Sequence, residues 1–96
     1  VYSLGAIMYH LLTGKPPFEG ETTWKTLQMA MSLAPKRPME LNAAMDARVE
    51  RIILACLHKE PVHRYTTALA LAEDIERVLA DKQPKGPAGI LGRLFS

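Results

Sequence analysis

The chain has 96 residues, of which 48% are hydrophobic, and its length supports one small domain. Nine basic and nine acidic side chains balance over residues 1–80, so the net charge of +2 belongs to the last 16 residues and no nucleic-acid-binding surface is expected. One cysteine, Cys56, excludes an internal disulfide, and the lack of a leader or of a run of about 20 apolar residues predicts a cytoplasmic chain.

The first predicted helix covers about residues 2–13 and is apolar nearly all round, as is typical of a helix buried on every side. Gly14 is the expected left-handed C-cap, and the prolines at 16 and 17 end the helix. Its first turn lacks a capping residue, and the chain opens on it without a methionine. We therefore interpret the sequence as a fragment. Its apolar repeat comprises Leu4, Ile7, Met8, Leu11 and Leu12.

A second helix is predicted for about residues 23–32, with Thr22 or Thr23 as its N-cap. Trp24, Leu27 and Met31 share one face of it. Residues 33–45 are predicted to be a connection without regular structure, because two prolines, at 35 and 38, interrupt backbone hydrogen bonding.

Two more helices complete the predicted all-α fold. The third extends from the N-cap Asp46 to about residue 58, and Pro61 closes it; the fourth extends from Thr66 or Thr67 to about residue 80. Cys56 falls on the apolar side of the third helix, where a small buried thiol is expected. The side chains expected to point inward from the fourth helix are Ala68, Leu71, Ala72, Ile75, Val78 and Leu79.

Residues 81–96 are rich in proline and glycine and predict a flexible tail after a helical domain at 1–80. The tail carries a short apolar patch at 90–95. A membrane-surface helix there is a weak hypothesis, since six residues bury little area.

Three motifs resemble those of one known family. They are Val-Tyr-Ser-Leu-Gly at 1–5, Thr-Gly-Lys-Pro-Pro-Phe at 13–18 and Cys-Leu-His-Lys-Glu-Pro-Val-His-Arg-Tyr at 56–65. In this order and spacing they resemble the C-terminal part of the catalytic domain of eukaryotic-like serine/threonine protein kinases, in particular the bacterial receptor-type subgroup. The resemblance implies a four-helix portion of the large lobe, with a tail leading towards a membrane segment or sensor domain.

The resemblance also implies structural roles for three residues. Ile7 and Leu11 match positions that support the hydrophobic stack beneath the adenine pocket, and we expect both to be buried. Arg64 matches the arginine that pairs with the glutamate of the Ala-Pro-Glu segment. Because this chain lacks that segment, we expect Arg64 to reach solvent or a carboxylate such as Glu60.

Three further positions match the side of the lobe that faces substrates and partners. Phe18 matches the turn beneath the substrate-binding surface, and Trp24 lies in the helix that often docks partners. Taken alone, Trp24 is interpreted as partly buried core. His10 replaces an acidic residue common in relatives that prefer basic substrates, which places such a preference in doubt.

The Gly-rich loop, the strand lysine, the catalytic loop and the Asp-Phe-Gly metal ligand of kinases are missing from this sequence. We therefore assign it no catalytic, cofactor-binding or metal-binding residue and predict that the chain alone is inactive. ATP and Mg²⁺ are expected in the intact parent, whose partners would be the rest of the kinase domain and its protein substrates. Because the elements that cover the first helix in the family are missing, we also expect exposed apolar surface on this helix and, as a result, self-association or a loosely packed state.

Other interpretations are weaker or belong to another class. A stand-alone helical module that binds proteins through Trp24 is the alternative function. His58 and His63 lack a third ligand at zinc-site spacing. Glu73 and Asp74 are interpreted as a solvated helix face rather than an acid/base pair.

Overall fold

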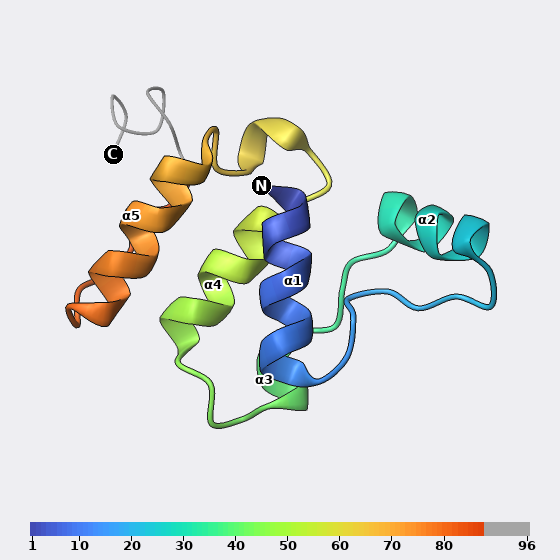
Figure 1. The fold of residues 1–96 in the computed structure, drawn as a ribbon, viewed down its shortest axis with the longest axis horizontal. Coiled ribbons are helices and arrows are strands. Elements are labelled where there is room, and N and C mark those ends of the chain that lie inside the picture. Colours follow the sequence, from blue (N-terminus) through green and yellow to red (C-terminus); the bar gives the residue numbers. More distant parts are fainter. Residues whose placement is uncertain (88–96) are drawn as a thin grey trace.

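The computed structural model describes residues 1–87, and within this range it contains helices and no strand, which confirms the all-α prediction (Figure 1). None of these helices has the length and apolar character needed to cross a bilayer. The elements in chain order are α1 (Tyr2–Thr13), α2 (Thr23–Ser32), α3 (Pro38–Leu41), α4 (Ala47–Cys56), a 3₁₀ turn (η1, Pro61–His63) and α5 (Ala68–Leu79).

The helix ends follow the local signals in the sequence. Gly14 caps α1 in the left-handed conformation, with φ of 80°. Side-chain oxygens of Thr22, Asp46 and Thr67 accept backbone hydrogen bonds at the starts of α2, α4 and α5. Val1, at the start of α1, supplies no side-chain cap.

The number of α-helices was predicted wrongly, because residues 33–45 include the short helix α3. Pro38 is its first residue, and at that position the missing N–H of proline costs nothing. The fixed φ of proline also suits a helix start, so a residue interpreted as a helix breaker begins one here.

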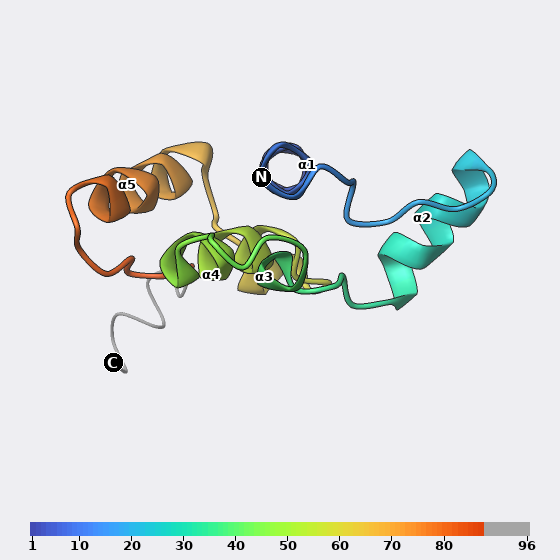
Figure 2. The same ribbon diagram turned by 90° about the horizontal axis from the view of Figure 1, so that it is seen from below.

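The helices form two layers and one outlying element. In Figure 2, α1 and α5 lie in one layer, α3 and α4 lie in the other, and α2 stands apart at one end. The core between the layers has two clusters. The first comprises Tyr9, Met45, Ile53 and Leu57, and the second comprises Ile52, Cys56, Tyr65 and Leu71.

Gly5 in α1 packs closely against Cys56 in α4. A Cβ atom placed on Gly5 would lie only 2.3 Å from the Cβ of Cys56, so no larger residue fits without movement. Burial raises the pKa of the Cys56 thiol to about 11, and the structure confirms a small buried thiol at this position.

The inward side of α5 is narrower than predicted. Leu71 is buried and Ile75 and Val78 pack partly against the core. Ala68, Ala72 and Leu79 are exposed, contrary to the prediction, because α4 covers only one side of α5. Leu79 is 81% exposed.

The first residues of the predicted flexible tail make defined contacts. Residues 81–86 turn back along α5 and bond to side chains of α4 and α5. The apolar patch at 90–95 lies outside the described residues. The mobility of the tail stays a prediction.

Candidate functional site

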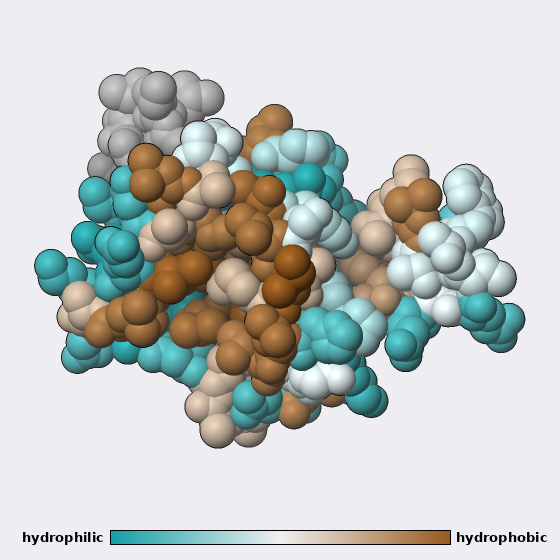
Figure 3. All heavy atoms as spheres, in the orientation of Figure 1, coloured by the Kyte–Doolittle hydropathy of each residue, from teal (hydrophilic) through white to brown (hydrophobic). Residues whose placement is uncertain are grey.

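The candidate site is the side of α1 that no other described element covers, here called the uncovered face and formed by Leu4, Ile7 and Leu11. Their exposed fractions are 43%, 55% and 77%. On α5, Leu69 and Leu79 are also exposed. Figure 3 shows hydrophobic residues gathered over both helices on this side of the molecule. Apolar areas of this kind on a small domain are typical of surfaces that contact a protein or a membrane.

The prediction that Ile7 and Leu11 are buried is wrong for this chain, whereas the expected exposed apolar surface on the first helix is confirmed. Helix α1 packs on α3 and α4 with its opposite side, where Gly5 and Tyr9 are buried. Nothing in residues 1–87 packs against the side that carries Ile7 and Leu11, so an apolar pattern extending round α1 is satisfied on one side only.

Arg64 lies close to the start of α1 and binds backbone oxygens. Its Nε donates to the carbonyl of His58 at 2.6 Å, and its Nη2 donates to the carbonyl of Lys59 at 3.3 Å. The guanidinium carbon lies 4.9 Å from the centre of the Tyr2 ring. The ion pairs found in residues 1–87 do not include Arg64, so neither full exposure nor pairing with Glu60 describes it.

His58 and His63 come together on the same turn. Their ring centres are 4.7 Å apart and the rings meet edge to face. The Nδ1 of His58 accepts a hydrogen bond from the backbone of Glu60 at 3.1 Å, which fixes the orientation of this ring. Within the part of the chain that the structure describes, no group of three or more His, Cys, Asp or Glu is placed to hold a metal ion.

The three residues predicted for the substrate or partner side are on separate elements. His10 is exposed on α1, and Phe18 is half-buried in the following loop, where the Lys59 ammonium lies 5.8 Å from its ring centre. Trp24 is 65% exposed on α2, so its interpretation as partly buried core is wrong. Helix α2 has no buried residue because it stands apart from the two layers (Figure 2).

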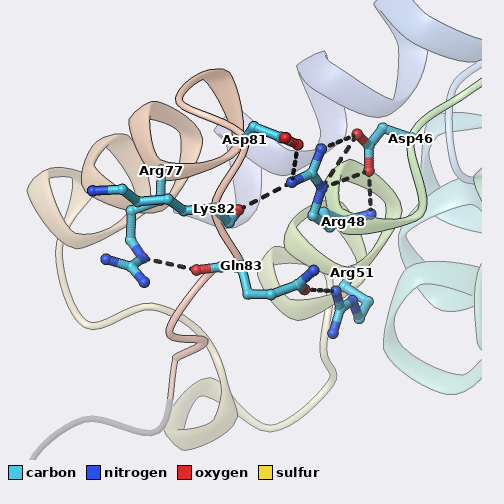
Figure 4. Close-up of polar contacts among 7 residues, drawn as sticks. All are labelled: Asp46, Arg48, Arg51, Arg77, Asp81, Lys82 and Gln83. Atoms are coloured by element: carbon cyan, nitrogen blue, oxygen red, sulfur yellow. Dashed lines mark hydrogen bonds and ion pairs between the residues drawn. The ribbon is translucent and has the colours of Figure 1, made fainter.

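A cluster of charged side chains, drawn in Figure 4, joins the start of α4 to the segment after α5. The Nη2 of Arg48 lies 2.8 Å from Asp46, and its Nη1 lies 3.0 Å from Asp81. The hydrogen bonds from Arg48 lower the pKa of Asp46 to about 2. Nearby, Gln83 receives hydrogen bonds from Arg51 and Arg77.

Asp74 is buried, with 3% exposure, although the sequence predicted a solvated face for it and its neighbour Glu73. Its carboxylate accepts a hydrogen bond from the Tyr65 hydroxyl at 2.6 Å and two backbone hydrogen bonds at 2.9 Å, from Lys85 and Gly86. Burial and the bond to Asp74 raise the pKa of Tyr65. Glu73 is exposed, as predicted.

Glu50 in α4 is the second buried carboxylate of the described residues, with 3% exposure, and it was not predicted from the sequence. It accepts hydrogen bonds from Arg37 Nη2 at 2.8 Å and from the Met39 N–H at 2.9 Å. Burial alone would raise the pKa of Glu50, but these two donors outweigh it, and the pKa lies below its ordinary value. Glu50 therefore ties the start of α3 to α4.

The buried carboxylates and the charged cluster hold the helices together, and the uncovered face presents an apolar surface. Both buried carboxylates use their oxygens on donors within the fold, and the Cys56 thiol is sealed beneath Gly5. The chemistry best supported by the described residues is therefore binding of another polypeptide segment at the uncovered face.

No protein-family model matches the chain. Among curated proteins, it is 33% identical over 87 residues to a protein named serine/threonine-protein kinase PknB of Mycobacterium tuberculosis (strain H37Rv) and 32% identical to that of Mycobacterium leprae. A probable PknB of Corynebacterium glutamicum is 34% identical over 82 residues. The two mycobacterial alignments each cover 91% of this chain and 14% of the relative, and the third covers 81% and 13%. The chain thus spans about one seventh of the length of these relatives.

Proposed function

Since this chain belongs to the serine/threonine protein kinase family as a homologue of one segment of it, we propose that it forms the C-terminal portion of a kinase large lobe. In the intact parent, this portion supports ATP-dependent transfer of a phosphoryl group to serine or threonine of protein substrates. Its contribution is mechanical, because it holds the loops that perform the chemistry.

The observation that carries this proposal is the uncovered face of α1. A helix that buries Gly5 and Tyr9 on one side and exposes Ile7 and Leu11 on the other has its second packing surface unused. In the proposed parent, the catalytic loop and the segments around it cover this face. Each large apolar side chain buried in this way contributes roughly 1.5–3 kcal/mol.

Arg64 has a proposed role at the edge of the same surface. In the parent, a glutamate of the substrate-side loop pairs with its guanidinium and ties that loop to the helical layer. The carbonyl oxygens of His58 and Lys59 already orient the guanidinium. Loop closure therefore requires only the incoming carboxylate to be positioned, since the arginine is held in place beforehand.

The chain alone is proposed to be inactive. In this proposal ATP and Mg²⁺ bind to parts of the parent outside this chain, because the motifs that supply the phosphate cradle, the metal ligands and the catalytic base of kinases are missing from its sequence. The chain accordingly acts on protein substrates only when it is joined to the rest of the kinase domain.

The test compares the 96-residue chain with the same chain extended by the residues encoded before Val1. Both are purified and supplied with radiolabelled ATP, Mg²⁺ and a general serine/threonine substrate. We expect phosphate transfer from the extended protein only. In that protein, Leu11→Asp should abolish transfer by opening the apolar contact, whereas Leu33→Asp, on an exposed leucine outside α1, should leave it largely intact.

Two results would contradict the proposal. The first is transfer by the pure 96-residue chain at the rate of the extended protein. The second is an upstream sequence without a nucleotide-binding loop and catalytic aspartate.

A second candidate function is that of a helical module that binds proteins through α2. The exposed Trp24, Leu27 and Met31 of this outlying helix favour it. Tryptophan is over-represented among residues that dominate binding energy at interfaces. Here, Trp24→Ala should remove binding of a partner isolated with the 96-residue chain, while Leu11→Ala should not. The opposite pattern would favour the kinase-lobe proposal.

A further inference from the structure

We propose that residues 81–86 form a strap that docks on α4 and α5 as part of the folded domain, and that Asp74 couples this strap to the turn holding Arg64. The strap leaves the end of α5 at Ala80, turns at Asp81, which has a positive φ of 60°, and returns to the level of Asp74 in the middle of the helix.

Hydrogen bonds anchor the strap along its length. The Lys82 N–H donates to the carbonyl of Arg77 at 2.7 Å. The carbonyl of Gln83 accepts from Arg77 Nε at 2.8 Å, and its side-chain oxygen accepts from Arg51 Nη2 at 2.6 Å (Figure 4). At the far end, the amides of Lys85 and Gly86 donate to Asp74. The strap therefore has contacts at its start, middle and end.

The hydrogen bonds from the strap to Asp74 are the ones whose loss should destabilise the fold most. Its carboxylate is almost wholly buried, and two of its three donors within residues 1–87 are strap amides. A buried carboxylate deprived of donors is strongly destabilised. Departure of the strap leaves Tyr65 as the remaining donor, so Asp74 must either turn towards solvent or draw the Tyr65 hydroxyl with it.

Tyr65 transmits this change because Arg64 directly precedes it. Tyr65 is 4% exposed and packs in the core cluster of Cys56 and Leu71, so a shift of its hydroxyl is expected to be passed to its backbone. The backbone N–H of Arg64 donates to Pro61 at 3.0 Å, and its guanidinium lies over Tyr2. A continuous set of contacts thus joins the strap, Asp74, Tyr65 and Arg64.

The test is hydrogen–deuterium exchange on the full chain, read on peptides that separate the strap from the Arg64 turn. We expect protected amides at 85 and 86 in the unaltered chain. Asp74→Asn should make them exchange about tenfold faster and should also speed exchange at Arg64 and Tyr65. Glu73→Gln is the matched control, since it removes the same charge from the neighbouring exposed position, and it should change neither region.

A second variant perturbs the strap without changing the buried carboxylate of Asp74. Gly86 has φ of 84° with open space around it, so Gly86→Ala strains the strap and leaves Asp74 intact. Gly14 has φ of 80° and equal space at the end of α1, which makes Gly14→Ala its control. Gly86→Ala should speed exchange in the strap and at Arg64, whereas Gly14→Ala should affect neither.

Two outcomes would refute the inference. Amides at 85 and 86 that exchange at the rate of an unstructured peptide in the unaltered chain would refute the docked strap. Faster exchange in the strap of Gly86→Ala, with no change at Arg64 and Tyr65, would refute the coupling. If Asp74→Asn unfolds the whole chain, the Gly86→Ala result decides.

Discussion

Helices α1 and α4 both carry apolar residues at helical spacing, but α1 is apolar nearly all round whereas α4 has one apolar stripe, and the two helices differ in how far they are buried. The apolar stripe of α4 is enclosed, with Ile52, Ile53 and Cys56 at 1% exposure or less. On α1, one side is enclosed and the other leaves Ile7 and Leu11 in solvent. Both patterns indicate burial, but burial also requires a neighbour. The comparison separates the helix whose apolar residues the described fold encloses from the helix whose apolar residues it leaves partly exposed.

Truncating one side chain on each helix to alanine should give the largest difference in the free energy of unfolding. Ile53→Ala removes a fully buried side chain and should lower the free energy of unfolding by about 2–5 kcal/mol, whereas Leu11→Ala should change it by less than about 0.5 kcal/mol in this chain. Urea unfolding followed by circular dichroism measures both. In the proposed full kinase, Leu11→Ala should approach the cost of Ile53→Ala. Equal costs in the isolated chain would contradict the comparison.

The next effect concerns the contact between α1 and α4 at Gly5 and Cys56. Gly5→Ala places a methyl group against Cys56 and should destabilise the chain by about 1–3 kcal/mol through overpacking. Ser3→Ala, at an exposed position of the same helix, is the control and should have little effect. A neutral Gly5→Ala, measured in the same urea titration, would show that α1 can move away from α4 without loss.

An effect of similar size is expected from the loss of the buried hydrogen bond of Tyr65. Tyr65→Phe keeps the ring in the core but removes the hydroxyl that donates to Asp74, and it should cost about 1–3 kcal/mol. Tyr2→Phe keeps the ring against Arg64 and serves as the control, with little change expected. If the two variants unfold at the same urea concentration, the Tyr65–Asp74 bond contributes nothing measurable.

The smallest effect is a pH dependence at Glu50, on the enclosed helix. The folded-state pKa of Glu50 is lowered, so its carboxylate stabilises the fold above the unfolded pKa, and this contribution is lost as the pH falls through the folded pKa. Acidification below about pH 4.3 should therefore destabilise the unaltered chain more than Glu50→Gln. Glu40→Gln, at an exposed position, is the control. Parallel pH profiles of the unaltered chain and Glu50→Gln would contradict this assignment.

Features that depend on a few consecutive residues were predictable from the sequence. The caps at Thr22, Asp46 and Thr67 and the left-handed Gly14 are local, because each side chain or backbone angle acts within one turn. The missed helix α3 is also local, and the position of Pro38 at its first residue was the available signal.

Features that depend on distant residues were not predictable in the same way. Asp74 is buried because residues 85–86, interpreted from composition as linker, bring it two donors. Its spacing of three from Leu71 placed it on the inward side of α5, so a signal existed. Exposure of Ile7 and Leu11 had no local signal, since the pattern of α1 does not show which of its sides another element covers. An exposed apolar surface on this helix was expected only from the resemblance to kinases.

The hydroxyl of Tyr9 reaches from α1 to the carbonyl of Lys36 at 2.7 Å, and the side chain of Asn42 donates to Leu12 at 2.9 Å. The long connection between α1 and α3, an excursion that contains α2, is therefore fixed to α1 near its return. Evolution can lengthen, shorten or replace such an excursion without disturbing the core, because the entropy of closing a longer loop rises slowly with its length. Across homologous chains, we expect residues 19–32 to vary most in length and the residues matching Tyr9 and Asn42 to stay as its anchors.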